Sequence, residues 1–105
     1  MIYEYRSYEA VPGRLEDVDA RFRDLTIKIF DRLGIETVGF WTATGPDRLV
    51  YLLRWADTEE RDVKWKRFLA DDEWKAGKAA SEANGPIVAG NHSEYWTPTS
   101  YSPLR

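Results

Sequence analysis

The 105-residue sequence contains no cysteine and only one histidine, His92. Without cysteine the chain has no disulfide, no thiolate nucleophile and no zinc–thiolate site, a composition typical of proteins in the reducing cytoplasm. No apolar run approaches the length of about 18 residues that a membrane span requires. The N-terminal region has no basic segment followed by an apolar one, and Glu4 and Glu9 come early, which argues against a signal peptide or a mitochondrial leader. We therefore expect a cytoplasmic protein without a membrane partner.

The sequence also lacks a strong net charge and the common nucleotide-binding motifs. Fifteen Lys and Arg residues against 18 Asp and Glu residues leave a formal net charge of −3, the wrong sign for a general nucleic-acid binder. There is neither a G-x-G-x-x-G motif nor a Walker A motif, and no histidine and carboxylate residues have the spacing of a metal site. We therefore predict no nucleic-acid partner, no bound metal and no cofactor.

Aromatic residues, by contrast, are abundant. They make up 14% of the chain, and five of them are tryptophan. Large rings are used in cores, in interfaces and in pockets for flat ligands, and all three uses stay open here. The length allows one domain, which we place at residues 1–105.

Four segments have the composition of β-strands. The first is rich in aromatic residues and ends before Pro12-Gly13, and the third is the most apolar. In the second, Gly39 is expected to mark a bulge or a close backbone approach. A short turn joins the second and third strands, which predicts an antiparallel hairpin. The predicted strands are 2–9, 35–44, 48–55 and 91–97.

Helical patterns occupy the segments between these strands. Over 14–33 the apolar residues recur at steps of three and four, as on one face of an amphipathic helix: Leu15, Val18, Phe22, Leu25 and Ile29. A second helix is expected to begin after Asp57, which Glu60 follows three residues later, and to end near Ala70. A third helix is predicted over 71–83. Charges of both signs alternate on the second helix, which predicts a solvated face for Arg61, Lys64, Lys66 and Arg67.

The order β-α-β-β-α-β predicts a ferredoxin-like α+β fold, in which helices cover one face of a four-stranded antiparallel sheet. The third strand, 48–55, is apolar on both of its faces. Such a strand is normally covered on both faces, and a second copy of the chain is the simplest cover for the face without helices. We therefore predict a homodimer.

Several short motifs, in conserved order along the chain, resemble those of the NIPSNAP family. They are Ile2-Tyr3-Glu4-Tyr5-Arg6, Pro12-Gly13, Gly34-Ile35, Val38-Gly39-Phe40-Trp41, Leu49-Val50-Tyr51-Leu52, Phe68-Leu69-Ala70-Asp71 and Glu73-Trp74. The resemblance covers nearly the whole chain and implies a dimeric α+β barrel, in which two ferredoxin-like subunits pack sheet to sheet. Related barrels include cofactor-free monooxygenases, heme-degrading oxygenases and muconolactone isomerases, although a fold does not determine an activity.

Glu4 and Arg6 share one face of the first strand, and a charged pair on a half-buried face needs partners. In one interpretation, Arg6 holds an anionic or carbonyl group of a substrate in a pocket between the sheet and the helices. In the other, the two residues form a structural ion pair, joined by Arg54 or Glu36 from neighbouring strands. The family motif includes both residues, so a shared role is expected.

His92 shares a strand face with Glu94 and Trp96. It is a candidate general base that Glu94 would orient, and the alternative is a histidine at the surface or in an interface. A heme-ligand role is disfavoured, because the ligand histidine of the heme-degrading relatives lies on a helix and no predicted helix here contains one.

Several tryptophans are candidates for the wall of a flat-ligand pocket, although core and dimer packing would use the same rings. His92 and Arg6 are the candidate catalytic residues. The residues predicted to form the substrate pocket are Glu4, Arg6, Trp41, Arg54, Trp65, Trp74, His92 and Glu94.

The leading hypothesis is a homodimer that holds a small apolar or aromatic ligand and acts as a cofactor-free monooxygenase or isomerase. The alternative hypothesis is a non-enzymatic protein-interaction module with a fully packed core. In that case Trp65 and Trp74 would pack in full contact and leave no cavity beside Arg6. The sequence leaves open whether the protein is an enzyme.

Overall fold

The computed structural model describes all residues, 1–105, and contains four strands and a layer of helices. The elements, in chain order, are β1 (Ile2–Ala10), α1 (Leu15–Arg21), the π-helical turn η1 (Phe22–Thr26), α2 (Ile27–Arg32), β2 (Glu36–Ala43), β3 (Arg48–Trp55), α3 (Thr58–Ala70), α4 (Asp72–Ser81) and β4 (Val88–Trp96).

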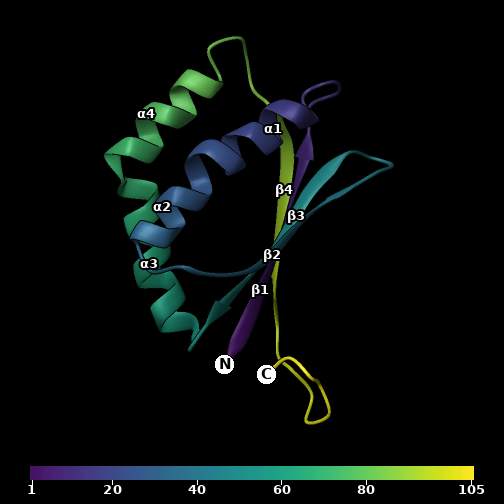
Figure 1. Cartoon of the computed structure of the whole chain (residues 1–105), viewed down its shortest axis with the longest axis vertical. Coiled ribbons are helices and arrows are strands. Elements are labelled where there is room, and N and C mark those ends of the chain that lie inside the picture. The colour runs from purple at the N-terminus through teal and green to yellow at the C-terminus, as the bar shows by residue number, and fades with distance from the viewer.

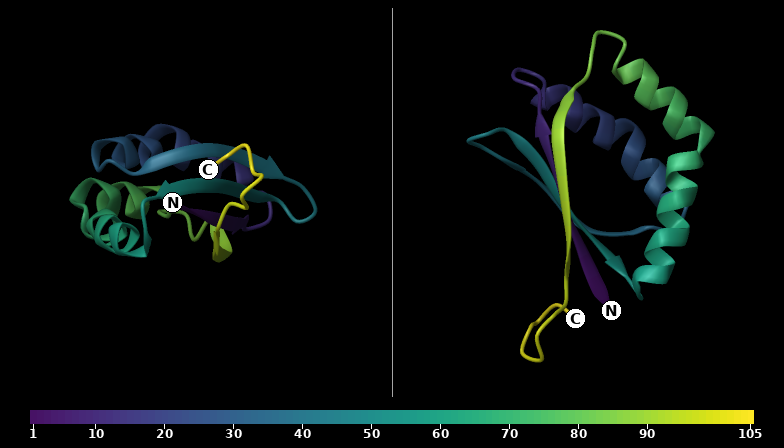
Figure 2. Two further views of the ribbon diagram at one scale, coloured as in Figure 1. Left: turned by 90° about the horizontal axis from the view of Figure 1, so that it is seen from below. Right: turned by 180° about the vertical axis from the view of Figure 1, so that it is seen from behind.

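The four strands form one antiparallel sheet in the order β2-β3-β1-β4. The helices all lie on one face of this sheet, and the N- and C-termini lie at the same end of the molecule (Figure 1). The other face carries no helix, as the two further views in Figure 2 show. This arrangement is the ferredoxin-like α+β fold that the element order predicts. None of its helices is long and apolar enough to cross a membrane.

Strand alternation decides which side chains face the helices. In β3 the residues Leu49, Tyr51, Leu53 and Trp55 are buried under the helices, and the residues between them are only partly buried. On the neighbouring β1, Glu4 is paired with Leu53 in the antiparallel register, so Glu4 also faces the helices.

The predicted strand boundaries are confirmed for the first three strands to within one or two residues. The last strand begins at Val88 and not at 91, because a register shift after Glu9 lets Ala10 pair with Val88. The predicted irregularity at Gly39 is also confirmed: the register of β2 against β3 shifts between Thr37 and Gly39.

The predicted helix over 14–33 is present, but it is not a regular α-helix throughout. The turn η1 widens it in the middle, and this changes which side chains face the sheet. The regular spacing predicted Leu25 as part of the buried face, whereas Leu25 is half-buried and Thr26 is buried in its place. The hydroxyl of Thr26 donates a hydrogen bond of 3.3 Å to the carbonyl oxygen of Arg21, five residues earlier.

Helix α3 begins with the cap that the sequence predicts after Asp57. The Asp57 carboxylate accepts a 2.8 Å hydrogen bond from the backbone N–H of Glu60, so Asp57 is the N-cap of α3. We expect Asp57→Ala to lower the free energy of unfolding by about 1 kcal/mol. Urea denaturation followed by circular dichroism measures this loss, and Lys66→Ala on the exposed face of α3 is the control. Equal stability of the two variants would contradict the capping role.

Candidate functional site

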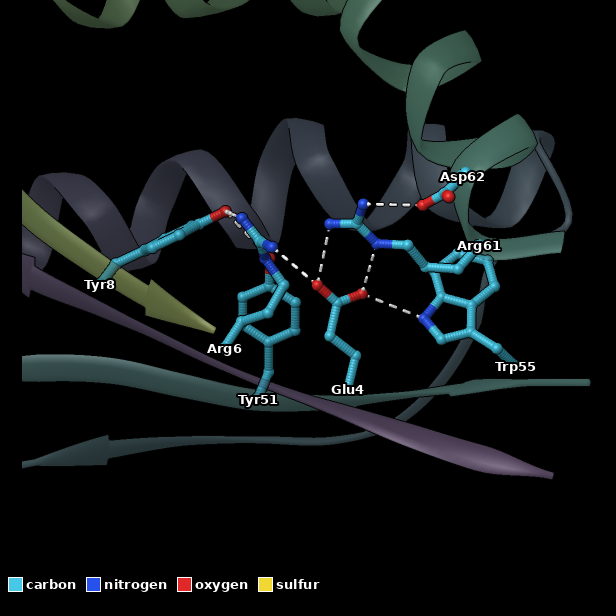
Figure 3. Close-up of polar contacts among 7 residues, drawn as sticks. All are labelled: Glu4, Arg6, Tyr8, Tyr51, Trp55, Arg61 and Asp62. Atoms are coloured by element: carbon cyan, nitrogen blue, oxygen red, sulfur yellow. Dashed lines mark hydrogen bonds and ion pairs between the residues drawn. The ribbon is translucent and has the colours of Figure 1, made fainter. Parts of the chain in front are cut away.

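A buried carboxylate lies between β1 and α3. The side chain of Glu4 is 1% exposed and accepts hydrogen bonds from four N–H donors on three side chains (Figure 3). Arg61 from α3 donates to both of its oxygens, from Nε at 3.1 Å and from Nη2 at 3.0 Å. Arg6 donates from Nη1 at 2.8 Å, and the indole N–H of Trp55 donates at 3.1 Å. The carboxylate therefore links two strands of the sheet to a helix above them.

Arg6 carries this network toward the middle of the sheet. Its Nε donates to the hydroxyl of Tyr51 at 2.9 Å, and its Nη2 donates to the hydroxyl of Tyr8 at 3.0 Å. The two hydroxyl oxygens are themselves 3.0 Å apart. The guanidinium also lies over the ring of Trp65, 4.2 Å from its centroid. Each nitrogen of Arg6 thus has a partner within the protein, as in the structural ion-pair interpretation.

The charges in this network are strongly stabilised. Burial alone would raise the pKa of Glu4, but the hydrogen bonds from Arg61 and Arg6 outweigh it, and the pKa lies below its usual value. Burial lowers the pKa of Arg6, but its contacts with Tyr51, Tyr8 and Glu4 outweigh burial and raise it. Burial raises the pKa of Tyr51 well above its usual value, so this hydroxyl keeps its proton at neutral pH.

A cavity of about 320 Å³ lies between the sheet and the helices, beside Arg6. We call it the sheet–helix cavity. Its polar wall carries Arg6 and Tyr8 from β1, Arg21 from the end of α1, and Lys78 and Glu82 at the end of α4. The rest of the wall is mainly aromatic, with Phe22, Phe30, Trp65, Phe68 and Trp74. A concave, mostly apolar site with a few convergent polar groups is the usual form of a small-molecule site.

The structure brings four of the predicted site residues together. Glu4 and Arg6 form the buried ion pair, and Arg6, Trp65 and Trp74 line the sheet–helix cavity. Neither Arg54 nor Glu36 joins the ion pair as predicted: they are 3.3 Å from each other on the opposite face of the sheet. Arg61 takes that place instead, because the register puts Arg54 opposite Tyr3 and not on the face of Glu4.

The other four predicted residues do not line the sheet–helix cavity. Trp41 is paired with Val50 and lies on the face without helices, 53% exposed. His92 and Glu94 are paired with Ser7 and Tyr5, which puts them on that same face. Arg54 also belongs to it, as described above. These residues alternate in the opposite phase from Glu4 and Arg6, and side chains of opposite phase project from opposite faces of a sheet.

His92 and Glu94 do contact each other, as the shared strand face predicts. The imidazole Nε2 is 3.0 Å from Oε2 of Glu94, and the indole N–H of Trp96 donates to Oε1 at 2.8 Å. The hydrogen bond from Trp96 and, to a smaller extent, the one with His92 hold the pKa of Glu94 below its usual value. The side chain of His92 is 64% exposed. Within one subunit this pair is separated from the sheet–helix cavity by the sheet itself.

Two arginines of the site, Arg61 in the Glu4 network and Arg21 in the cavity wall, are not among the predicted site residues. Arg61 was expected on a solvated helix face, but it points inward to Glu4. Its spacing of four from Trp65 and seven from Phe68 was the available signal, because residues at this spacing share one helix face. Arg21, which lines the sheet–helix cavity, is also absent from the prediction, although its spacing of three from buried Val18 places it on the same helix face.

The structure shows no group of three or more His, Cys, Asp or Glu side chains that could hold a metal ion. The groups that the sheet–helix cavity offers a ligand are guanidinium and ammonium N–H donors, hydroxyls, the Asn91 amide, the Glu82 carboxylate and aromatic faces. This set can bind an apolar ring and orient one polar group at its edge.

The fold and the buried Glu4–Arg6 pair define a ferredoxin-like α+β protein with a charged cluster under its helices. The NIPSNAP family model matches residues 3–103, so the chain belongs to the NIPSNAP family. Comparison with curated protein sequences gave no match.

Solved structures show the same fold. An uncharacterized NIPSNAP domain protein from Burkholderia xenovorans is 21% identical, with a TM-score of 0.85 over 98% of this chain and 99% of that chain. A NIPSNAP family protein of unknown function from Agrobacterium tumefaciens is 24% identical, with a TM-score of 0.85 over 100% of this chain and 94% of that chain. An antibiotic biosynthesis monooxygenase is 13% identical, with a TM-score of 0.62 over 94% of this chain and 99% of that chain.

The buried carboxylate predicts a specific dependence of stability on pH. Because the pKa of folded Glu4 lies below its usual value of 4.5, the unfolded chain binds a proton at this residue more readily than the folded chain does. Its contribution to stability is therefore complete above the unfolded pKa and is lost as the pH falls through the folded pKa. We expect Glu4→Gln to lower the free energy of unfolding at pH 7 by about 3 kcal/mol, since it leaves two buried guanidinium groups without their carboxylate. We also expect the free energy of unfolding of Glu4→Gln to fall less than that of the wild type as the pH is lowered into the acid range.

Urea titrations at a series of pH values measure both effects. Glu73→Gln is the matched control, because Glu73 forms an exposed ion pair with Arg32 at 3.1 Å and exposed pairs contribute about 1 kcal/mol or less. If Glu4→Gln were as stable as Glu73→Gln at pH 7, the central role of this carboxylate would be refuted.

Proposed function

We propose that the protein is a homodimer in which each subunit binds a small, mostly apolar molecule in the sheet–helix cavity. The observation that carries this proposal is the cavity itself, an aromatic space of about 320 Å³ beside a buried arginine. Pockets for small ligands generally begin at about 300 Å³. An apolar cavity of about 150 Å³ accommodates benzene, so the volume is sufficient for a flat molecule of one or two rings.

The alternative function, a protein-interaction module without a ligand, requires a fully packed core. The rings of Trp65 and Trp74 each contact Phe68, at centroid distances of 5.0 and 4.6 Å. This aromatic layer still leaves the space beside Arg6 open. A packed core normally has few voids larger than a water molecule, so a space of this size favours ligand binding.

If the ligand is a substrate, we propose that the reaction is cofactor-free, as in a monooxygenase or an isomerase. Tyr51 accepts a hydrogen bond from Arg6, and its own proton can be donated to Tyr8. The oxygen of Tyr8 then accepts from both Arg6 and Tyr51, and its remaining O–H is available to an oxygen atom of a ligand. Tyr8 is therefore the candidate proton donor inside the cavity. His92 and Glu94 remain candidates for a role on the opposite face, where a second subunit would cover them.

The homodimer is supported by the sheet face that carries no helix. Val50 and Leu52 lie in the centre of this face and are only half-buried in the single chain. Around them, Tyr5 stacks on Trp96 with ring centroids 4.9 Å apart, and Trp41 is 53% exposed. An apolar face of this kind is a typical interface between two copies of a chain.

A charge in the middle of this face tests the dimer. We expect Leu52→Asp to convert the dimer to a monomer or to unfold it, because the interface would bury an unpaired carboxylate. Sedimentation velocity of the purified protein measures the oligomeric state. Val63→Asp, on the exposed surface of α3, is the control and should remain dimeric. A folded, dimeric Leu52→Asp variant would show that the subunits do not pair through this face.

A substitution that fills the cavity tests ligand binding. Val88 lines the cavity from the edge strand β4, and in Val88→Phe a ring would occupy part of the space. With 2-naphthamide as a neutral two-ring probe, we expect the wild type to bind and Val88→Phe to bind about tenfold more weakly or not at all, because the probe and the new ring compete for the same volume. Isothermal titration calorimetry measures both affinities. Val63→Phe, outside the cavity, should bind like the wild type, and equal binding by Val88→Phe would contradict the proposed site.

A further inference from the structure

We infer that Arg21 anchors the acidic group of the ligand, so that the ligand is a flat apolar carboxylate with its ring among the aromatic residues and its carboxylate on this guanidinium. The inference rests on the proposed ligand site in the sheet–helix cavity and adds the chemical class of its occupant. Arg21 is not among the site residues that the sequence predicts.

Arg21 is buried without enough partners in the chain. Its side chain is 5% exposed, yet its Nε has no hydrogen-bond partner. Its guanidinium has five N–H groups, and one of them donates to the hydroxyl of Ser81, at 3.2 Å from Nη1. The carboxylate of Glu82 lies 3.7 Å from the same Nη1, too far for a good hydrogen bond. A buried guanidinium with this many free donors is costly unless a further acceptor is present.

Arg6 and Arg21 line the same cavity but differ in their partners. All three nitrogens of Arg6 donate to Glu4, Tyr8 and Tyr51, so Arg6 is committed to the fold. Arg21 has a single donated hydrogen bond, and its carboxylate neighbour Glu82 is partly exposed. An incoming anion would therefore find its donors on Arg21 and not on Arg6.

The local structure explains why an arginine points inward at this position. Arg21 is the last residue of α1, and η1 begins directly after it. Arg21 and Phe22 follow buried Val18 by three and four residues and so share its face, and the wider turn adds Thr26 to the buried side; Arg21, Phe22 and Thr26 all line the cavity. π-helical turns occur frequently at functional sites. Here the turn directly follows the charged group, next to the aromatic wall.

The surrounding charge also favours an anion. The charged residues in the cavity wall are Arg6, Arg21, Lys78 and Glu82, three cations against one carboxylate. The guanidinium of Arg21 additionally lies 5.4 Å from the ring centroid of Trp74. Burial lowers the pKa of Arg21 more than the ion pair with Glu82 raises it, and a bound carboxylate would offset the cost of burying this charge through paired hydrogen bonds.

The test compares two probes of nearly the same shape, 2-naphthoate and its neutral amide, 2-naphthamide. Isothermal titration calorimetry at pH 7 gives the affinity of each for the wild type, Arg21→Gln and Arg23→Gln. Arg23 is the matched control, because it lies two residues away on the same helical segment with its side chain 59% exposed. Circular dichroism checks that each variant is folded.

We expect the wild type to bind the carboxylate at least about tenfold more tightly than the amide, since hydrogen bonds to charged groups are the strong ones. Arg21→Gln should lose this preference while it retains its affinity for the amide, and Arg23→Gln should behave like the wild type. Arg21→Lys, which keeps the charge but not the paired N–H groups, should retain part of the preference.

The outcomes separate the two proposals. If the wild type bound both probes equally, or if Arg21→Gln kept the preference for the carboxylate, the role of Arg21 would be overturned while the cavity remained a ligand site. If neither probe bound to the wild type, the ligand site and the inference would both be overturned. If Arg21→Gln does not fold, Arg21→Lys decides the question in its place: a reduced preference for the carboxylate supports the role of Arg21, and an unchanged preference overturns it.

Discussion

The structure depends on one buried carboxylate. Glu4 is enclosed by Arg6, Arg61 and the indole of Trp55, and it joins strands β1 and β3 to helix α3. Burying an ionised carboxylate costs desolvation free energy, and this cost is offset only when charged partners and hydrogen bonds surround the group. Here both oxygens of Glu4 are bonded to guanidinium groups, so the carboxylate stabilises the contact between sheet and helix layer only as long as all partners are present.

Glu4 holds Arg6 in place, and Arg6 forms part of the wall of the sheet–helix cavity. Glu4 holds one side of its guanidinium, and the two tyrosine hydroxyls hold the other side. The flat face of the group is thereby placed against Trp65, which forms part of the aromatic wall. A charged, rigidly held residue cannot collapse into the neighbouring space as an aliphatic side chain would. The network that joins the two layers thus also helps to keep a space open between them.

The fold could be read from the sequence because its signals are local. Alternation in 48–55, the spacing of apolar residues after Leu15 and the capping pair Asp57 and Glu60 each depend on near neighbours in the chain. The same holds for the contact between His92 and Glu94, which are two residues apart on one strand. The family assignment drew on motifs spread over nearly the whole chain, and the match to residues 3–103 confirms it.

The residues of the site could not be predicted in the same way. They depend on the register between strands, which decides which side chains of different strands lie on the same face of the sheet. Alternation places His92 and Glu94 together, but only the pairing of His92 with Ser7 shows that they project away from Arg6. The β1–β4 ladder also includes a register shift after Glu9, which no local pattern indicates and which moves the start of β4 to Val88. The burial of Thr26 in place of Leu25 likewise depends on the π-helical turn, where regular helical spacing fails.

The central claim is that the space between the sheet and the helices is a binding site for a flat acid. A crystal structure of the protein grown with 2-naphthoate tests this claim most directly. We expect electron density for the ring between Phe22 and Trp65, with the carboxylate within hydrogen-bond distance of Arg21. A cavity closed by its own aromatic side chains, or a probe bound only on the opposite face near His92, would contradict it.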